Sequence, residues 1–191
     1  EHAVGEQEQA VALGDAAGLG TIQNDDSASL TLVGVAASQP EGSSGTTTAF
    51  TFSVSLSAAV QGGFDVAYAT NDGTATVADG DYLDNDGSLH FAGVAGETQS
   101  ITVVVNHDSK VEADELFEVA LGAISGLGAN PSALVKTGSP AIGTIQNDDF
   151  GVFAIRQNVN GAEDGGPITF TIDLSNPVDE ATSVAVSTAD G

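Results

Sequence analysis

The sequence predicts an all-β fold, an antiparallel sandwich of about seven strands repeated in tandem, and three observations carry this prediction. Polar and apolar residues alternate in many short stretches, which turn-forming residues separate. No comparable stretch has convincing helical periodicity. Residues 20–26, Gly-Thr-Ile-Gln-Asn-Asp-Asp, recur unchanged as residues 143–149, so the chain contains tandem repeats 123 residues apart.

The expected strands follow one another through the middle of the chain. In residues 50–56, phenylalanine, valine and leucine alternate with threonine and serine, which is typical of a half-buried strand. The expected strands are residues 30–35, 50–56, 64–68, 89–91, 101–105, 117–121 and a strand ending at Ile145. Turn signals lie between them at residues 61–63, 71–73, 86–87, 95–96 and 130–131. Seven short antiparallel strands at this spacing predict an immunoglobulin-like β-sandwich.

A second pair of matches sets the expected domain boundaries. Residues 50–57 resemble 168–175, and residues 66–73 resemble 184–191, both 118 positions apart. The difference of five residues from the first offset is absorbed between Asp26 and Phe50, where residues 40–45 are typical of a loop. We therefore expect three parts, namely residues 1–26 as the C-terminal tail of a preceding repeat, 27–149 as a complete repeat, and 150–191 as the N-terminal part of a following repeat. Because the chain begins without Met and ends within a repeat, we expect it to be a piece of a longer protein.

The charge of the chain restricts its partners. It has 27 acidic residues against three basic ones, Lys110, Lys136 and Arg156, and a net charge of −24. Such a chain does not neutralise phosphates, so we expect no nucleic acid and no anionic membrane surface as partner, and no apolar run is long enough for membrane insertion. Cations are the natural partners. High charge also keeps proteins soluble, and this alternative explains scattered acids, although not acids clustered at repeated motif positions.

Several carboxylates are expected to meet at one end of the sandwich, where loops from distant parts of the chain come together. Most lie just beyond a strand end, and with so few basic residues salt bridges cannot neutralise them all, so they would repel one another or require a cation. They are Glu41, Asp72, Asp79, Asp81, Asp108, Glu112, Asp114 and Glu115. Ca²⁺ suits such a site better than Mg²⁺, because it accepts six to eight oxygens from irregular loops. The absence of cysteine excludes disulfides and thiolate metal sites.

An ordered set of motifs resembles the Calx-β domain. The motifs are Asp72-Gly73-Thr74-Ala75, Gly80-Asp81-Tyr82, Gly96-Glu97-Thr98, residues 108–115 and residues 143–149. This resemblance implies a seven-stranded sandwich that binds Ca²⁺ through loops at one end, as in sodium–calcium exchangers, integrin β4 and large bacterial surface proteins. It implies ten ligand candidates, Glu41, Asp72, Asp79, Asp81, Asp108, Glu112, Asp114, Glu115, Asp148 and Asp149. The loop from Asp72 to Asp81 is one residue longer than the commonest form, with Asp79 filling the gap, and the segment around Asp108 is less acidic, so we expect fewer or weaker ions.

Plainer alternatives stay open at several of these positions. Asp72-Gly73 is also compatible with a simple turn, residues 148–149 with a solvated linker, and Glu112 and Glu115 with an ordinary charged loop. His107 beside Asp108 has no supporting nucleophile or second histidine, so we expect no enzyme.

The functional expectation is a calcium-binding structural or adhesive module of a long, secreted or cell-surface bacterial protein. In it, Ca²⁺ would rigidify loops and the junctions with neighbouring repeats. Two alternatives are a filament subunit that joins other copies by strand addition and a Ca²⁺ sensor domain of a larger protein. The sequence identifies no adhesive ligand.

Overall fold

The computed structural model describes residues 25–42, 45–128, 135–156 and 160–189, together with Gly18, Gly20 and Ile22. The expectation for residues 1–26 therefore falls mostly outside the described residues. All regular structure in the described part is β-strand, which confirms the predicted fold class. The strands are β1 (Ala28–Ala36), β2 (Ser38–Pro40), β3 (Thr47–Leu56), β4 (Phe64–Asp72), β5 (Gly87–Phe91), β6 (Thr98–Asn106), β7 (Glu115–Ser125), β8 (Val135–Thr137), β9 (Ala141–Gln146), β10 (Phe153–Ile155) and β11 (Ile172–Leu174).

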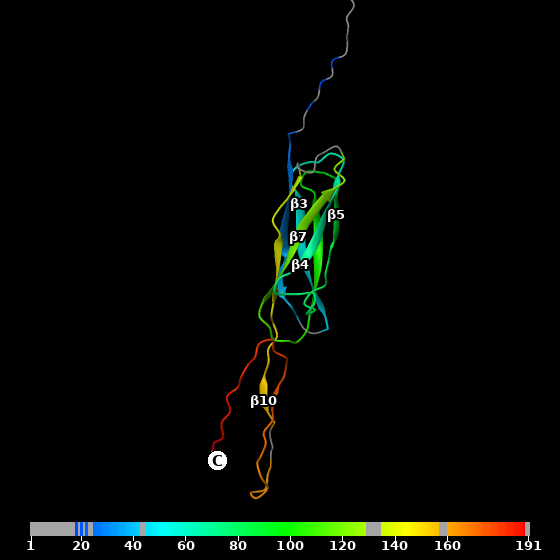
Figure 1. Cartoon of the computed structure of the whole chain (residues 1–191). Coiled ribbons are helices and arrows are strands. Elements are labelled where there is room, and N and C mark those ends of the chain that lie inside the picture. The colour runs from blue at the N-terminus through cyan, green and yellow to red at the C-terminus, as the bar shows by residue number, and fades with distance from the viewer. Residues whose placement is uncertain are drawn as a thin grey trace, which may run out of the picture.

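Nine of these strands form two facing sheets. One sheet has the order β6-β3-β1-β8 and the other the order β2-β9-β7-β4-β5. The strands run roughly along the long axis of an elongated sandwich, and β10 lies beyond one of its ends (Figure 1). All seven predicted strands are present, and the short strands β8 and β2 are additions at the edges of the first and second sheets.

The short strand β2 follows β1 closely but belongs to the opposite sheet. β1 pairs antiparallel with β3, whereas β2 pairs in parallel with β9 of the opposite sheet. The change of sheet follows a register irregularity between Gly34 and Ala36. A Cβ atom at Gly34 would lie 2.5 Å from the Cβ of Ala37, so this crossing requires a residue without a side chain. The crossing carries the chain to Glu41, at the end of the sandwich where β9 also finishes.

The core contains the apolar positions of the predicted alternation. Phe50, Phe52, Val54 and Leu56 of β3 are buried, and the residues between them are only partly so. Phe117 of β7 contacts rings from the facing sheet, with centroid separations of 5.6 Å to Phe50 and 6.0 Å to Phe52. Burial of these side chains is the main driving force for closing the two sheets over each other.

Tyr82 extends this aromatic core toward one end of the sandwich. Its ring lies on that of Phe117 with a centroid separation of 4.9 Å, and its backbone forms an isolated bridge to Val105 of β6. The long β4–β5 connection is thereby anchored in the core, and its acidic residues are held near the strand ends.

The segment after Asp149 begins a second hairpin. β10 pairs antiparallel with β11, with Phe153 opposite Leu174 and Ile155 opposite Ile172. This register is that of β1 and β3, in which Leu30 lies opposite Leu56 and Leu32 opposite Val54. Residues 153–155 are displaced by 123 positions from 30–32, and residues 172–174 by 118 from 54–56, which are the two offsets of the internal repeat.

Residues 184–189 match part of β4 at the offset of 118, but they form no strand. In the central sandwich, β4 lies between β5 and β7 and bonds to both. A strand is stable only with such partners, and among the described residues 184–189 has none.

Candidate metal centre

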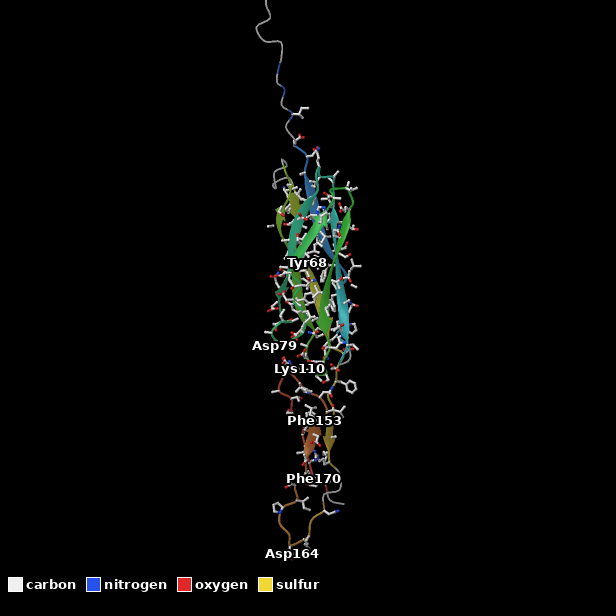
Figure 2. All side chains as sticks on the ribbon, turned by 90° about the vertical axis from the view of Figure 1, so that its right-hand side faces the viewer. Tyr68, Asp79, Lys110, Phe153, Asp164 and Phe170 are labelled. Atoms are coloured by element: carbon white, nitrogen blue, oxygen red, sulfur yellow. The ribbon has the colours of Figure 1, made fainter. Side chains whose placement is uncertain are left out.

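Loops from four parts of the sequence meet at the end of the sandwich that faces the following segment. They follow β2, β4, β6 and β9, and Figure 2 shows Asp79 and Lys110 at this end. We define the acid end as six of the acidic residues in these loops and at the start of β7, namely Glu41, Asp81, Asp108, Glu112, Glu115 and Asp149.

Glu41 is placed by an extension of the β2–β9 ladder. Its backbone N–H donates to the Gln146 carbonyl at 2.9 Å, and its own carbonyl accepts from the Thr48 hydroxyl at 3.2 Å. The side chain is buried, with 7% of the residue exposed. One carboxylate oxygen accepts the Asp108 backbone N–H at 2.8 Å. Burying an ionised carboxylate that accepts such a bond is still costly in free energy unless a positively charged group also contacts it.

Glu41, Asp108 and Asp149 form the first of two carboxylate clusters. Each offers one oxygen, and these oxygens all lie within 4.8 Å of one another. The Oδ2 atom of Asp149 is buried and has no hydrogen-bond partner. A buried polar atom without a partner is rare in native proteins and is typical of a position where a ligand binds or where the protein is strained.

Asp81, Glu112 and Glu115 form the second cluster, with their oxygens again within 4.8 Å of one another. The side chain of Asp81 is fixed by the β4–β5 loop, because its Oδ2 accepts the Thr76 backbone N–H at 2.7 Å. The second cluster and Glu41 of the first line a common pocket, together with Ala113, Ile145 and Asn147.

The electrostatics of the pocket disfavour ionised carboxylates. Burial raises the pKa of Glu41 from 4.5 to about 7, and the charges of Asp108, Glu112 and Asp149 add to the rise, although the Asp108 N–H opposes it. Burial likewise raises the pKa of Glu115 from 4.5 to about 7, helped by the charges of Asp81 and Glu112. The pKa of each glutamate is therefore well above that of an ordinary carboxyl group, and a bound cation would favour the ionised form of both.

Two other predicted ligands, Asp72 and Asp79, lie outside both clusters and organise the β4–β5 loop. The Oδ1 atom of Asp72 accepts the Tyr82 hydroxyl at 2.7 Å and the Val77 backbone N–H at 3.0 Å, and the Tyr82 bond lowers the pKa of Asp72. Asp79 is exposed, and its Oδ2 accepts the Thr76 hydroxyl at 3.1 Å. These bonds are those of a structured turn, in which both side chains satisfy local donors.

Asp114 and Asp148 also lie outside the two clusters. Asp114 accepts the Asn147 backbone N–H at 3.1 Å, and Asp148 accepts the Gly42 backbone N–H at 3.0 Å. Both join loops that are far apart in sequence. The structure thus brings six of the ten candidates together in the two clusters. The other four accept hydrogen bonds that hold the loops in place.

His107 supports the loop that carries Glu41. Its ring nitrogens bond to the hydroxyls of Thr46 and Thr48, the latter at 2.6 Å. A Cβ at Gly42, where φ is 103°, would lie 2.4 Å from the His107 Cε1, so the ring packs directly on this glycine.

The comparison with protein families identifies this architecture. The family model described as Calx-beta domain matches residues 26–149.

The chain belongs to the Calx-beta domain family.

Solved structures similar to this Calx-beta chain include three Calx structures. The structure titled "Crystal structure of Apo-form Calx CBD1 domain" is 24% identical with a TM-score of 0.48, and the match covers 63% of this chain and 98% of that one. "Crystal structure of CBD12 from CALX1.2" is 27% identical with a TM-score of 0.48, covering 70% of this chain and 51% of that one. "Crystal structure of calcium binding domain CBD12 of CALX1.1" is 24% identical with a TM-score of 0.46, covering 62% of this chain and 45% of that one. The chain thus spans nearly all of the first structure and about half of the other two. A comparison with curated proteins finds no match.

The residues of this Calx-beta domain fit a hard divalent cation. The acid end offers carboxylate oxygens from several loops, which is the donor set that Ca²⁺ prefers. Such an ion would give a partner to the buried Oδ2 of Asp149, which has no hydrogen bond, and to the buried Glu41 carboxylate, which accepts the Asp108 N–H. Glu41, Asp108 and Asp149 would hold one ion, and Asp81, Glu112 and Glu115 would hold a second or share it.

Asn147 is a residue that the sequence reasoning left out of the site. Its Oδ1 accepts the Glu112 N–H at 3.1 Å, and its Nδ2 donates to the Asp149 carbonyl at 3.0 Å. It therefore holds one residue from each cluster. The signal that could have identified it is its place in the repeated heptapeptide, directly before the two aspartates.

The described residues contain no helix that is long and apolar enough to cross a membrane.

Proposed function

We propose that this chain is a calcium-binding structural module of a long, secreted or cell-surface bacterial protein, with an adhesive or spacer role. In this proposal, Ca²⁺ binds at the acid end and stiffens its loops and the junction with the next repeat. The observation that carries the proposal is the first cluster, in which a buried glutamate and a partnerless aspartate oxygen face one another.

The negative charge of the acid end supports the proposal that it binds a cation. Six carboxylates within two small clusters repel one another, and at this end Lys110 is the basic side chain that contacts them. A divalent ion would replace that repulsion by attraction and would be bound only in the folded state. It would then stabilise the fold by RT ln(1 + [Ca²⁺]/Kd), about 2.7 kcal/mol at a hundredfold excess over Kd.

The setting of a repeat array supports a structural role over a sensing role. The internal heptapeptide is unchanged between copies, and each copy carries its aspartates where one repeat meets the next. The chain has no cysteine, so bound metal would supply the rigidity that disulfides give many secreted domains. Extracellular Ca²⁺ near millimolar concentration suits weak sites of this kind.

The test is a calorimetric titration of the metal-stripped 191-residue chain with Ca²⁺, with thermal melts alongside. We expect binding, a rise in Tm, and loss of both in Asp149→Asn. Asp79→Asn is the matched control, because it removes the same charge from a loop residue outside both clusters. An unchanged Tm in Ca²⁺, or equal losses in both variants, would reject the proposed site. A Kd of micromolar or tighter would favour the sensor alternative.

A filament subunit remains a second candidate because of one observation on the following hairpin. Phe153 is 39% exposed and Ile155 54%, whereas the residues that match them, Leu30 and Leu32, are 1% and 7% exposed. These residues present the face that is the core of the central sandwich, and strands from another copy would cover it. Concentration-dependent sedimentation would support this candidate, and a monomer at all concentrations would eliminate it.

A further inference from the structure

The following segment contacts the central sandwich at the loop between β6 and β7. The Val111 backbone N–H donates to the Pro177 carbonyl at 2.9 Å, and the Asp179 N–H donates to the Val111 carbonyl at 3.0 Å. These two bonds make a short parallel bridge between Val111 and Val178. The segment after β11 thus adds one rung of strand pairing to a loop of the preceding repeat.

Apolar groups close this contact around a glycine. A Cβ at Gly151 would lie 3.1 Å from Leu174 Cδ1 and 3.8 Å from both the Val111 Cγ2 and the Val178 Cγ1 atoms. Side chains from the β6–β7 loop, from β11 and from the segment after β11 therefore surround one point. Since Gly151 lies two residues after Asp149, the last residue of the central repeat, the connection is short and the contact forms at high effective concentration.

Lys110 supplies the charge of this contact. Its Nζ atom pairs with Asp179 of the following segment at 2.9 Å and also with Glu112 of the acid end. The bonds to Glu112 and then to Asp179 raise the pKa of Lys110 above its usual range, so the side chain stays charged. Its backbone N–H donates to Asp108 Oδ1 at 2.6 Å, which fixes the loop that presents it.

We propose that Lys110, Val111 and residues 177–179 form a lock that holds the next repeat against the acid end without a metal ion. An exposed ion pair contributes little attraction by itself. Its importance here is that Asp179 would otherwise approach Glu112 and its neighbours as an uncompensated like charge. Lys110 removes that repulsion, and the backbone bridge and the apolar contact can then form.

The matching loop of the central repeat lacks the acidic residue of the lock. At the offset of 118, Val178 matches Val60 of the central repeat, whereas Asp179 matches Gln61. The same ion pair could therefore not form with that loop, because it carries an amide where the following segment carries a carboxylate.

The test measures the distance between two spin labels on the full chain, which has no natural cysteine. The labels are attached after Thr102→Cys on β6 and Ala154→Cys on β10, both exposed positions. We expect a narrow distance distribution in wild type in chelator, where the lock acts alone, and Ca²⁺ would add to it by stiffening the loops of the acid end. K110E should lose the narrow peak, and K110E/D179K should regain it. K136E is the matched control, because it makes the same charge change on β8, beside the start of β1, and should keep the peak.

Three results would overturn the lock. They are a broad distribution for wild type in chelator, a narrow one for K110E, or no recovery in the charge-swapped double variant. Thermal melts of each variant show whether the central sandwich is folded, so that loss of the lock is distinguished from loss of the domain. Calorimetry of Ca²⁺ binding is read separately, so the failure of the calcium proposal would leave these outcomes unchanged.

Discussion

Glu41→Gln tests whether the acid end is strained without a cation. The folded environment raises the pKa of Glu41 from 4.5 to about 7. At 1.36 kcal/mol per pKa unit, keeping this group ionised at pH 8 costs at most about 3.4 kcal/mol, and solvent at the mouth of the pocket reduces this to about 1–2 kcal/mol. Glutamine is close in size to glutamate and still accepts the Asp108 N–H, which lies 2.8 Å away. We therefore expect the variant to be more stable than wild type in chelator at pH 8, with Tm higher by roughly 3 to 8 °C.

The pH dependence of this effect has a defined sign. Because folded Glu41 holds its proton more tightly than unfolded Glu41, the contribution of this group is least unfavourable below pH 4.5 and becomes more unfavourable as pH rises to about 7. The advantage of Glu41→Gln should therefore grow between these two values and be small at pH 4.5. In Ca²⁺ the order should reverse, because wild type gains about 2.7 kcal/mol at a hundredfold excess over Kd and the variant has lost one charged ligand.

The assay is differential scanning calorimetry of both proteins at several pH values, in chelator and in Ca²⁺. Asp79→Asn is the control, since it removes one charge outside both clusters and should change the stability by less than about 0.5 kcal/mol. A variant that is less stable than wild type in chelator at pH 8, or an advantage that is equally large at pH 4.5, would show that the reasoning about buried charge is wrong.

Two further predictions concern the supports of the site. Tyr82→Phe removes the 2.7 Å hydrogen bond to Asp72, and we expect urea unfolding to show a free energy of unfolding lower by about 1–2 kcal/mol. NMR titration should show the pKa of Asp72 rising toward its ordinary value, because that bond lowers it. An unchanged Asp72 pKa would contradict this prediction. Gly143→Ala should lower the stability of the fold by about 1–3 kcal/mol in thermal melts, because the new Cβ would lie 2.3 Å from the Phe117 ring. Gly20→Ala is the control at the matching position of the identical heptapeptide, where a Cβ would have nothing within 4 Å, and it should leave the stability unchanged. Equal effects of the two substitutions would refute the packing argument.

Strand content was readable from the sequence because alternation is a local property. A residue such as Phe52 faces the core for the same reason that its neighbours Thr51 and Ser53 do not, since successive side chains of a strand point to opposite faces. The short strand β2 could not be predicted in this way. Its formation depends on which sheet offers it a partner, and on the close approach of Gly34 to Ala37, which only the folded backbone defines.

The roles of the individual carboxylates also could not be predicted from the sequence. The sequence indicated which loops carry acids and that basic residues were too few to pair with them. It did not separate Glu41, which is buried among other charges, from Asp79, which satisfies a local hydroxyl. That distinction depends on desolvation and on distances between residues far apart in the chain.

The sequence by itself determined the sandwich class, the tandem repeat and the excess of negative charge, because these follow from periodicity, identity and composition. Only the tertiary structure decided which six carboxylates form the two clusters, that Asn147 joins these clusters, and that Lys110 reaches Asp179 across a repeat boundary. The physical reason is that interactions between charges depend on separation and burial, and both are set by how the loops of distant strands meet.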